Sequence, residues 1–150
     1  MNKRFTYLLS VLLAQQVIGQ DLIPQSFKVH ADPLVKGINH YQVTHVKNAG
    51  TVRSGNFKVG YYLSADAVYN LEDRFIGNSD DLNLAAGLSD STFVNVSIPN
   101  DAAPGNYYLL ARTDYENTVA ETNELNNTIS TAITVVEKSM DLSISGLTYP

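Results

Sequence analysis

Short segments of alternating apolar and polar residues run through this chain, and no stretch longer than about eight residues repeats with a helical period. The alternating segments are rich in β-branched and aromatic residues, and Gly, Pro, Asn and Asp separate them. Such a pattern predicts short β-strands joined by turns. Strands that recur at this spacing are typical of two packed sheets, so we expect an all-β sandwich.

The expected strands follow one another from residue 21 to residue 136, and alternation also predicts which side chains face the core. The strands are placed at 21–29, 38–47, 57–63, 74–78, 82–85, 94–98, 107–113 and 129–136. The first of them contains a proline, which marks an edge or a break in a strand. The core is expected to contain Phe57, Val59, Tyr61, Leu63, Val94, Val96, Ile98 and Leu110.

One of these segments, 38–47, does not keep a single phase. Tyr41 and Val43 share one face, whereas Val46 falls on the other. An extra residue in a strand returns the following side chains to the original face. We therefore expect a β-bulge near Thr44 and His45 that brings Val46 back to the core.

Residues 1–20 have the organisation of an export signal. Lys3 and Arg4 form a charged start, an apolar run follows over 5–14, and Gly19 supplies a small residue before a cut. The run is too short for a permanent membrane helix, although an uncleaved anchor is the alternative. We expect cleavage after Gly19 or Gln20 and a secreted or surface-displayed product.

Charge and cysteine content exclude several classes of partner and chemistry. Without Lys3 and Arg4, 8 basic residues remain against 15 acidic ones, a net charge of about −7. Such a charge disfavours nucleic acid and anionic membranes as partners. The chain has no cysteine, which excludes disulfides, thiol catalysis and thiolate metal sites.

The most polar segment, 114–127, lies between two expected strands and reads D-Y-E-N-T-V-A-E-T-N-E-L-N-N. Asp and Asn side chains hydrogen-bond nearby backbone and tolerate turn dihedrals, so we expect an ordered, turn-rich loop. Carboxylate and amide oxygens are also the ligands that Ca²⁺ prefers, although no EF-hand spacing is present. We prefer turn capping as the role of these side chains, with a calcium site as the alternative. The candidate ligands are Asp114, Asn117, Glu121 and Glu124, with Asp66 and Asp73 as helpers.

The spacing D-x-x-N-x-V-x-E-x-N-E-x-N-N resembles the closing signature of the CARDB family, the cell-adhesion-related domains found in bacteria. Further stretches fit in the family's order: V-K-N-A-G-T at 46–51, G-Y-Y-L-S-A-D at 60–66, D-R-F-I-G at 73–77, I-P at 98–99 and G-N-Y-Y-L at 105–109. The resemblance implies an immunoglobulin-like antiparallel β-sandwich of about seven strands over 21–137. It also implies a non-catalytic module of secreted and surface proteins.

Residues 138–150 are interpreted as a linker. Asp141 and Leu142 repeat the pair Asp21 and Leu22, and in the family such a pair opens the first strand. We therefore expect a possible start of a second, truncated copy here, with a frayed tail as the alternative.

Other candidate sites are weaker. His40 and His45 differ by an odd number and face opposite sides of a regular strand, so packed or solvated roles are preferred for them and for His30. Glu121 and Glu124 lie too close in one loop to flank a glycosidic bond, and no nucleophile elbow or zinc-protease motif occurs. Tyr61-Tyr62 and Tyr107-Tyr108 are interpreted as cross-strand support, with a sugar-stacking platform as the alternative.

These observations predict a non-catalytic extracellular module that acts as a spacer, adhesion or presentation domain of a larger protein. The alternative is a carbohydrate-binding accessory module of a secreted hydrolase. The expected partners are neighbouring domains of the same protein, together with surface glycans or proteins. We expect no nucleic acid partner and no membrane span in the mature chain. Calcium is the one cofactor considered.

Overall fold

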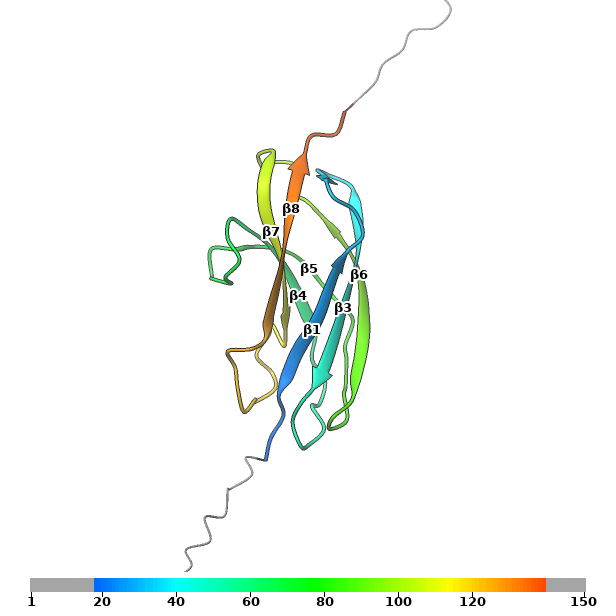
Figure 1. The fold of residues 1–150 in the computed structure, drawn as a ribbon, viewed down its shortest axis with the longest axis vertical. Helices are drawn as coiled ribbons and strands as arrows, with labels where there is room; N and C mark the ends of the chain where they lie inside the picture. Colours follow the sequence, from blue (N-terminus) through cyan, green and yellow to red (C-terminus); the bar gives the residue numbers. More distant parts are fainter. Residues whose placement is uncertain (1–17, 140–150) are drawn as a thin grey trace, which may run out of the picture.

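The computed structural model describes residues 18–139, and they form two largely antiparallel β-sheets packed face to face (Figure 1). The expected all-β, immunoglobulin-like sandwich is confirmed. One sheet has the order β1-β3-β6, and the other has the order β2-β8-β7-β4-β5. The strands are β1 Leu22–Val29, β2 Leu34–Val35, β3 Asn39–Asn48, β4 Val59–Ser64, β5 Arg74–Asn78, β6 Ser89–Ser97, β7 Gly105–Thr113 and β8 Thr128–Val136.

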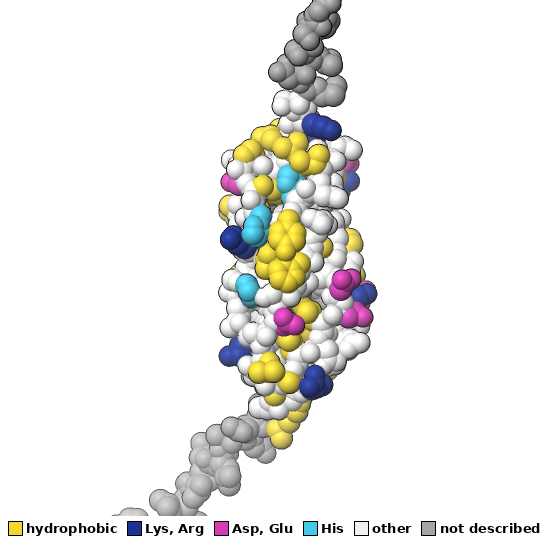
Figure 2. Space-filling view, turned by 90° about the vertical axis from the view of Figure 1, so that its right-hand side faces the viewer, with side chains coloured by type: hydrophobic (Ala, Val, Ile, Leu, Met, Phe, Trp, Pro, Cys, Tyr) yellow, Lys and Arg dark blue, Asp and Glu magenta, His cyan; other side chains and the backbone are white. Residues whose placement is uncertain are grey.

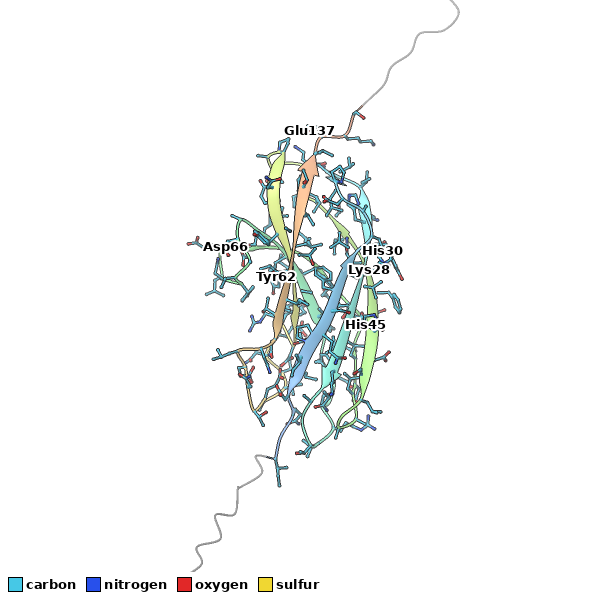
Figure 3. All side chains as sticks on the ribbon, viewed as in Figure 1. Lys28, His30, His45, Tyr62, Asp66 and Glu137 are labelled. Atoms are coloured by element: carbon cyan, nitrogen blue, oxygen red, sulfur yellow. The ribbon has the colours of Figure 1, made fainter. Side chains whose placement is uncertain are left out.

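The sandwich is elongated, and the described chain enters and leaves it at opposite ends (Figure 1). The start of β1 lies at one end, and β8 leads out at the other, where Glu137 is labelled in Figure 3. All strand pairs are antiparallel except the short β2, which pairs in parallel with the last residues of β8. The expected signal peptide and the possible second copy fall largely on 1–17 and 140–150, outside the described residues. Within the described part, no helix has the length and apolar character needed to cross a bilayer.

The core lies between the two sheets, and alternation predicted most of it. Val59, Tyr61 and Leu63 of β4 point inward and are buried, as are Val96 of β6 and Ile98 just after it. The expected strand at 82–85 is wrong, because only Leu82 makes an isolated bridge there, to Phe57.

Leu110 is buried as expected, but it faces the other side of its sheet. Its neighbours Leu109 and Ala111 belong to the cluster between the sheets. Leu110 pairs with Tyr62 of β4, so both side chains lie on the outer face. Tyr62 is only 6% exposed there, because Tyr69 and Phe75 pack against it with ring centroids 4.9 and 5.4 Å away. The outer face of this sheet therefore carries an aromatic cover.

The bulge expected in 38–47 is wrong. The register of β3 with β6 runs without a shift, and the one irregularity nearby lies in β1, between Pro24 and Ser26. The inward face of β3 consequently carries His40, Gln42, Thr44, Val46 and Asn48, and all five are buried.

Hydrogen bonds satisfy part of the polar face that β3 turns inward, while the side-chain nitrogen and oxygen of Gln42 are buried there without a partner. The Thr44 hydroxyl lies 3.0 Å from the Tyr61 hydroxyl, and His40 Nε2 lies 2.8 Å from the carbonyl oxygen of Val35. A buried polar group that finds a partner recovers most of the cost of leaving water. Tyr41 and Val43 therefore face outward, and Tyr41 is 43% exposed.

Replacing Val96 with Asp should destabilise the fold by more than about 3 kcal/mol, because the new carboxylate would be buried without a partner. Val96 has no exposed surface and lies in the cluster between the sheets. Asn95→Asp is the matched control, since it makes the same acid one position away on the exposed face. Thermal or urea unfolding measures both variants. Equal stability of the two would show that the phase of β6 is misassigned.

Candidate functional site

The acidic loop, residues 114–127, joins β7 to β8 at the end of the sandwich where β1 begins (Figure 1). It is tied to the residues that lead into β1. Gln20 pairs with Glu121 as a parallel bridge, and the Gln20 carbonyl accepts hydrogen bonds from Thr122 N at 2.8 Å and Thr122 Oγ1 at 3.1 Å. Asn126 Nδ2 donates to Asp21 Oδ1 at 2.8 Å. The loop therefore holds the entering chain against the body of the domain.

Asp114 organises the first half of the loop, as turn capping predicts. Its carboxylate is buried, and Oδ1 accepts hydrogen bonds from Thr118 N at 3.1 Å and Thr118 Oγ1 at 2.8 Å. Oδ2 accepts one from Val119 N at 2.8 Å. Asp114 and Asn117 both have positive φ angles, 44° and 54°, which Asp and Asn adopt more readily than most residues. These donors offset the charge of the buried carboxylate.

Glu121 lies in the second half of the loop and joins it to β1. Oε2 accepts a hydrogen bond from Leu22 N, and Oε1 accepts one from Asn127 Nδ2 at 2.8 Å. Burial raises the pKa of Glu121 from 4.5 to about 7, although both hydrogen bonds favour the ionised form. The nearby charges of Glu124 and Asp114 raise it further. Glu121 thus changes charge near neutral pH.

The other predicted ligands do not join a single cage. Glu124 Oε1 accepts a hydrogen bond from Glu121 N at 2.9 Å, and Asn117 lies in an exposed turn. Asp66 and Asp73 lie in the loop between β4 and β5, where each caps a local turn through Val68 N and Asn70 N. Because β4 and β7 are antiparallel, Asp66 follows the end of β4 that pairs with Tyr108, whereas Asp114 follows the opposite end of β7, beside Val59, as expected. Residues 18–139 contain no group of three or more His, Cys, Asp or Glu that could hold a metal ion.

The sequence analysis did not identify two buried hydrogen-bond acceptors in the loop. The side-chain oxygens of Asn126 and Asn127 are buried and have no hydrogen-bond partner. The amide nitrogens of both residues donate to carboxylates, Asp21 and Glu121, which leaves the oxygens free. The double asparagine that closes the segment was the available signal, but its burial comes from the packing against β1.

The histidines and paired tyrosines lie apart from this loop. His40 faces the core, whereas His45 faces solvent with Nδ1 at 2.7 Å from Ser91 Oγ. Tyr62, which alternation places outward, is covered by other aromatic rings and forms no exposed platform. Tyr62 does support the sheet across strands, but its partner is Phe75 of β5. The expected pairing with Tyr107-Tyr108 is wrong, because Tyr62 lies opposite Leu110 and Tyr108 opposite Ser64.

The raised pKa of Glu121 predicts a pH-dependent stability. A carboxyl whose folded pKa exceeds its unfolded value stabilises the fold below about pH 4.5, and that contribution is lost as the pH rises through about 7. The melting temperature of the wild type should therefore fall between pH 5 and pH 8 by more than that of Glu121→Gln, which cannot titrate. Glu116→Gln changes an exposed glutamate of the same loop and should keep the wild-type dependence. Parallel pH profiles for all three proteins would contradict the assignment.

Several solved structures resemble this fold. The CARDB domain of the PF1109 protein from Pyrococcus furiosus, in complex with di-metal ions, is 24% identical with a TM-score of 0.58, covering 81% of this chain and 94% of that chain. A domain (272–376) of a proposed cell surface protein from Methanosarcina acetivorans is 22% identical with a TM-score of 0.56, covering 80% and 94%. The β-glucosidase EmGH1 from Erythrobacter marinus is 15% identical with a TM-score of 0.53, covering 78% of this chain and 16% of that one.

At these identities the structures show a shared fold alone. No curated protein sequence matches the chain. The family model of CARDB matches residues 19–131, which is most of the described sandwich. On that match, the chain belongs to the CARDB family.

Proposed function

We propose that this chain is a non-catalytic, surface-displayed module that holds neighbouring domains apart. The observation that carries the proposal is that the described chain enters an elongated sandwich before β1 at one pole and leaves it after β8 at the other (Figure 1). A rigid domain that is entered at one pole and left at the other adds its own length to any chain that contains it. The export signal expected at the N-terminus and the fold shared with a proposed cell surface protein support a location outside the cell.

Both poles are fixed to the body of the domain, as a spacer requires. At the entry, Thr51 N donates to the Gly19 carbonyl at 2.8 Å, and Gln20 is held by the acidic loop. At the exit, Lys36 N donates to the Val136 carbonyl at 3.1 Å. Lys36 Nζ also pairs with Glu137 Oε1 at 2.7 Å. A load applied between the ends is therefore carried into the sandwich rather than into loose termini.

The arrangement of the acidic loop also supports a non-catalytic role. Glu121 and Glu124 are the carboxylate pair that a glycosidase would need on opposite sides of its substrate. Here one carboxylate accepts a hydrogen bond from the backbone of the other residue, and Glu121 is itself bound to β1. The pair is part of the loop's own framework.

Replacing residues 19–137 with a flexible Gly-Ser segment of equal length tests the spacer role in a displayed chain. An epitope placed after Pro150 should stand at one narrow height above the cell surface in the wild type. In the replacement, the height should be broadly distributed, because such a segment is a flexible coil. Super-resolution or quenching measurements of the epitope give the height. The same distribution in both chains would contradict the spacer role.

We also propose that the acidic loop takes up a divalent cation such as Ca²⁺. The observation that favours it is the pair of buried, unpartnered oxygens of Asn126 and Asn127, whose amide nitrogens donate to the carboxylates of Asp21 and Glu121. Hard cations bind this set of amide and carboxylate oxygens, and the added charge would stabilise the ionised form of Glu121. The PF1109 domain, which shares the fold, was solved with di-metal ions. Asp114 would stay in its capping role.

Thermal unfolding with millimolar Ca²⁺ and with chelator tests this site. A cation bound only by the folded state, at a hundredfold excess over its Kd, adds about 2.7 kcal/mol and raises the melting temperature by several degrees. We expect the rise in the wild type and in Glu116→Gln, but not in Glu121→Gln. Asp114→Ala should melt lower than the wild type with or without calcium. A wild type that melts at one temperature in both solutions would exclude the site.

A further inference from the structure

The outer face of the β1-β3-β6 sheet carries an exposed pair of aromatic rings. Tyr41 is 43% exposed and Phe93 is 59% exposed. Their ring centroids are 6.1 Å apart, and the ring planes differ by 14°. The register explains the contact, because Val43 lies opposite Phe93 and Tyr41 opposite Asn95, so the two rings are diagonal neighbours. Figure 2 shows this face, with hydrophobic side chains gathered in its middle.

Basic side chains surround the aromatic pair. Lys28 lies opposite Val43 in the register, and the His30 ring centroid is 5.2 Å from that of Tyr41. His45 and Lys47 continue the outward face along β3. Figure 3 labels Lys28, His30 and His45 along this side of the molecule, and Figure 2 shows histidines and basic residues beside the hydrophobic group. The outward positions of the three strands, taken from Ser26 to His30, from Tyr41 to Lys47 and from Ser89 to Asn95, carry no carboxylate.

This face differs from the rest of the protein in two respects. The whole chain has a net charge of −5, whereas the outward strand positions of this face carry two lysines and two histidines and no carboxylate. Asp and Glu side chains lie beside them in Figure 2, and the exposed Asp90 is part of β6, so the positive character is confined to these outward positions. The opposite sheet covers its outward Tyr62 with Tyr69 and Phe75, and its exposed ring, Phe75, packs against both Tyr62 and Tyr115. Phe93, the more exposed ring at 59%, packs only against Tyr41 among the aromatic rings of the described residues. Exposed apolar surface in a polar rim marks an interaction site.

We propose that this face binds an anionic polysaccharide. The flat side of a pyranose ring presents C–H groups that pack against aromatic faces, and two nearly parallel rings offer adjacent places for such packing. Lysine ammonium groups form charge-assisted hydrogen bonds with the carboxylates of uronic acids. The hydroxyl and amide groups of Ser26, Ser91 and Asn95 line the same face and suit sugar hydroxyls.

The shape and charge of the face select this occupant over others. Neighbouring strands lie side by side, so an extended chain can cross the face while its negative groups meet Lys28 and Lys47. Ser91 Oγ lies within hydrogen-bond distance of His45 Nδ1, so the other ring nitrogen, Nε2, is the one that can hydrogen-bond to a bound chain. The proposal rests on the proposed extracellular location but not on the spacer role. The two proposals can therefore fail separately. A chain that does not bind the glycan could still hold the epitope at its height, and a chain that does not act as a spacer could still bind the glycan.

Binding of the full chain to polygalacturonate, measured by affinity electrophoresis and calorimetry, tests the proposal. We expect binding that weakens with salt and that is at least tenfold weaker in Phe93→Ala and in Lys28→Glu. Phe75→Ala is the matched control, because Phe75 is an exposed phenylalanine on the opposite sheet. It should bind as the wild type does. A neutral β-glucan should bind at least tenfold more weakly than polygalacturonate.

Four outcomes would overturn the proposal. They are no binding to polygalacturonate, equal affinity for the neutral glucan, equal affinity for single-stranded DNA, and loss of binding in Phe75→Ala but not in Phe93→Ala. Sedimentation of the wild type and of Phe93→Ala tests whether a second copy of the chain binds this face instead. A dimer that Phe93→Ala dissolves would assign the face to a second copy of the chain instead. Melting curves of each variant show that the fold is retained.

Discussion

Leu22 is the point at which the two sheets and the entering chain are joined. Its side chain is fully buried, its backbone N–H donates to the Glu121 carboxylate, and its carbonyl accepts a hydrogen bond from Thr113 Oγ1 at 2.9 Å. Leu22 belongs to the β1-β3-β6 sheet, whereas Thr113 ends β7 of the other sheet and Glu121 lies in the loop that follows. These bonds close one end of the sandwich and set where the chain enters it.

The same connection explains why a carboxylate is kept in a partly buried place. Glu121 accepts hydrogen bonds from Leu22 and Asn127, which would remain unsatisfied if the residue were apolar. The cost of burying the charged carboxylate appears as a raised pKa of Glu121, because the effect of desolvation is larger than that of the two hydrogen bonds. A cation would relieve that cost, and protonation relieves it as well. Stability and pH dependence are therefore coupled through one side chain, and the proposed cation site would depend on the same residue.

The two outer faces of the sandwich are used differently. On the five-stranded sheet, Tyr62, Tyr69, Phe75 and Tyr115 pack on one another, and the Arg112 guanidinium lies 4.5 Å from the centre of the Tyr69 ring. On the three-stranded sheet, Tyr41 and Phe93 pack together but stay exposed among basic groups. On the first face the rings pack against β5 and the loops, although Phe75 stays partly exposed, and on the second face the pair packs only on itself and His30.

Sequence alternation by itself determined that the chain is a β-sandwich, and it placed the inward residues of β4 and β6 correctly. It worked there because the inward residues are apolar and the outward ones mostly polar, so only one phase buries the apolar set. The spacing of the acidic loop likewise identified the family and the capping role of Asp114. These features depend on local pattern, which a sequence displays directly.

Only the tertiary structure decided the phase of β3 and the surroundings of the acidic loop. Tyr41 and Val43 look like core residues, yet Thr44 and His40 turn inward because Tyr61 and the Val35 backbone supply partners from other strands. The free oxygens of Asn126 and Asn127 arise in the same way, from contacts with Asp21 and Glu121. Alternation defines two faces of a strand, but the partners that satisfy a polar face are distant in sequence, and folding alone brings them together.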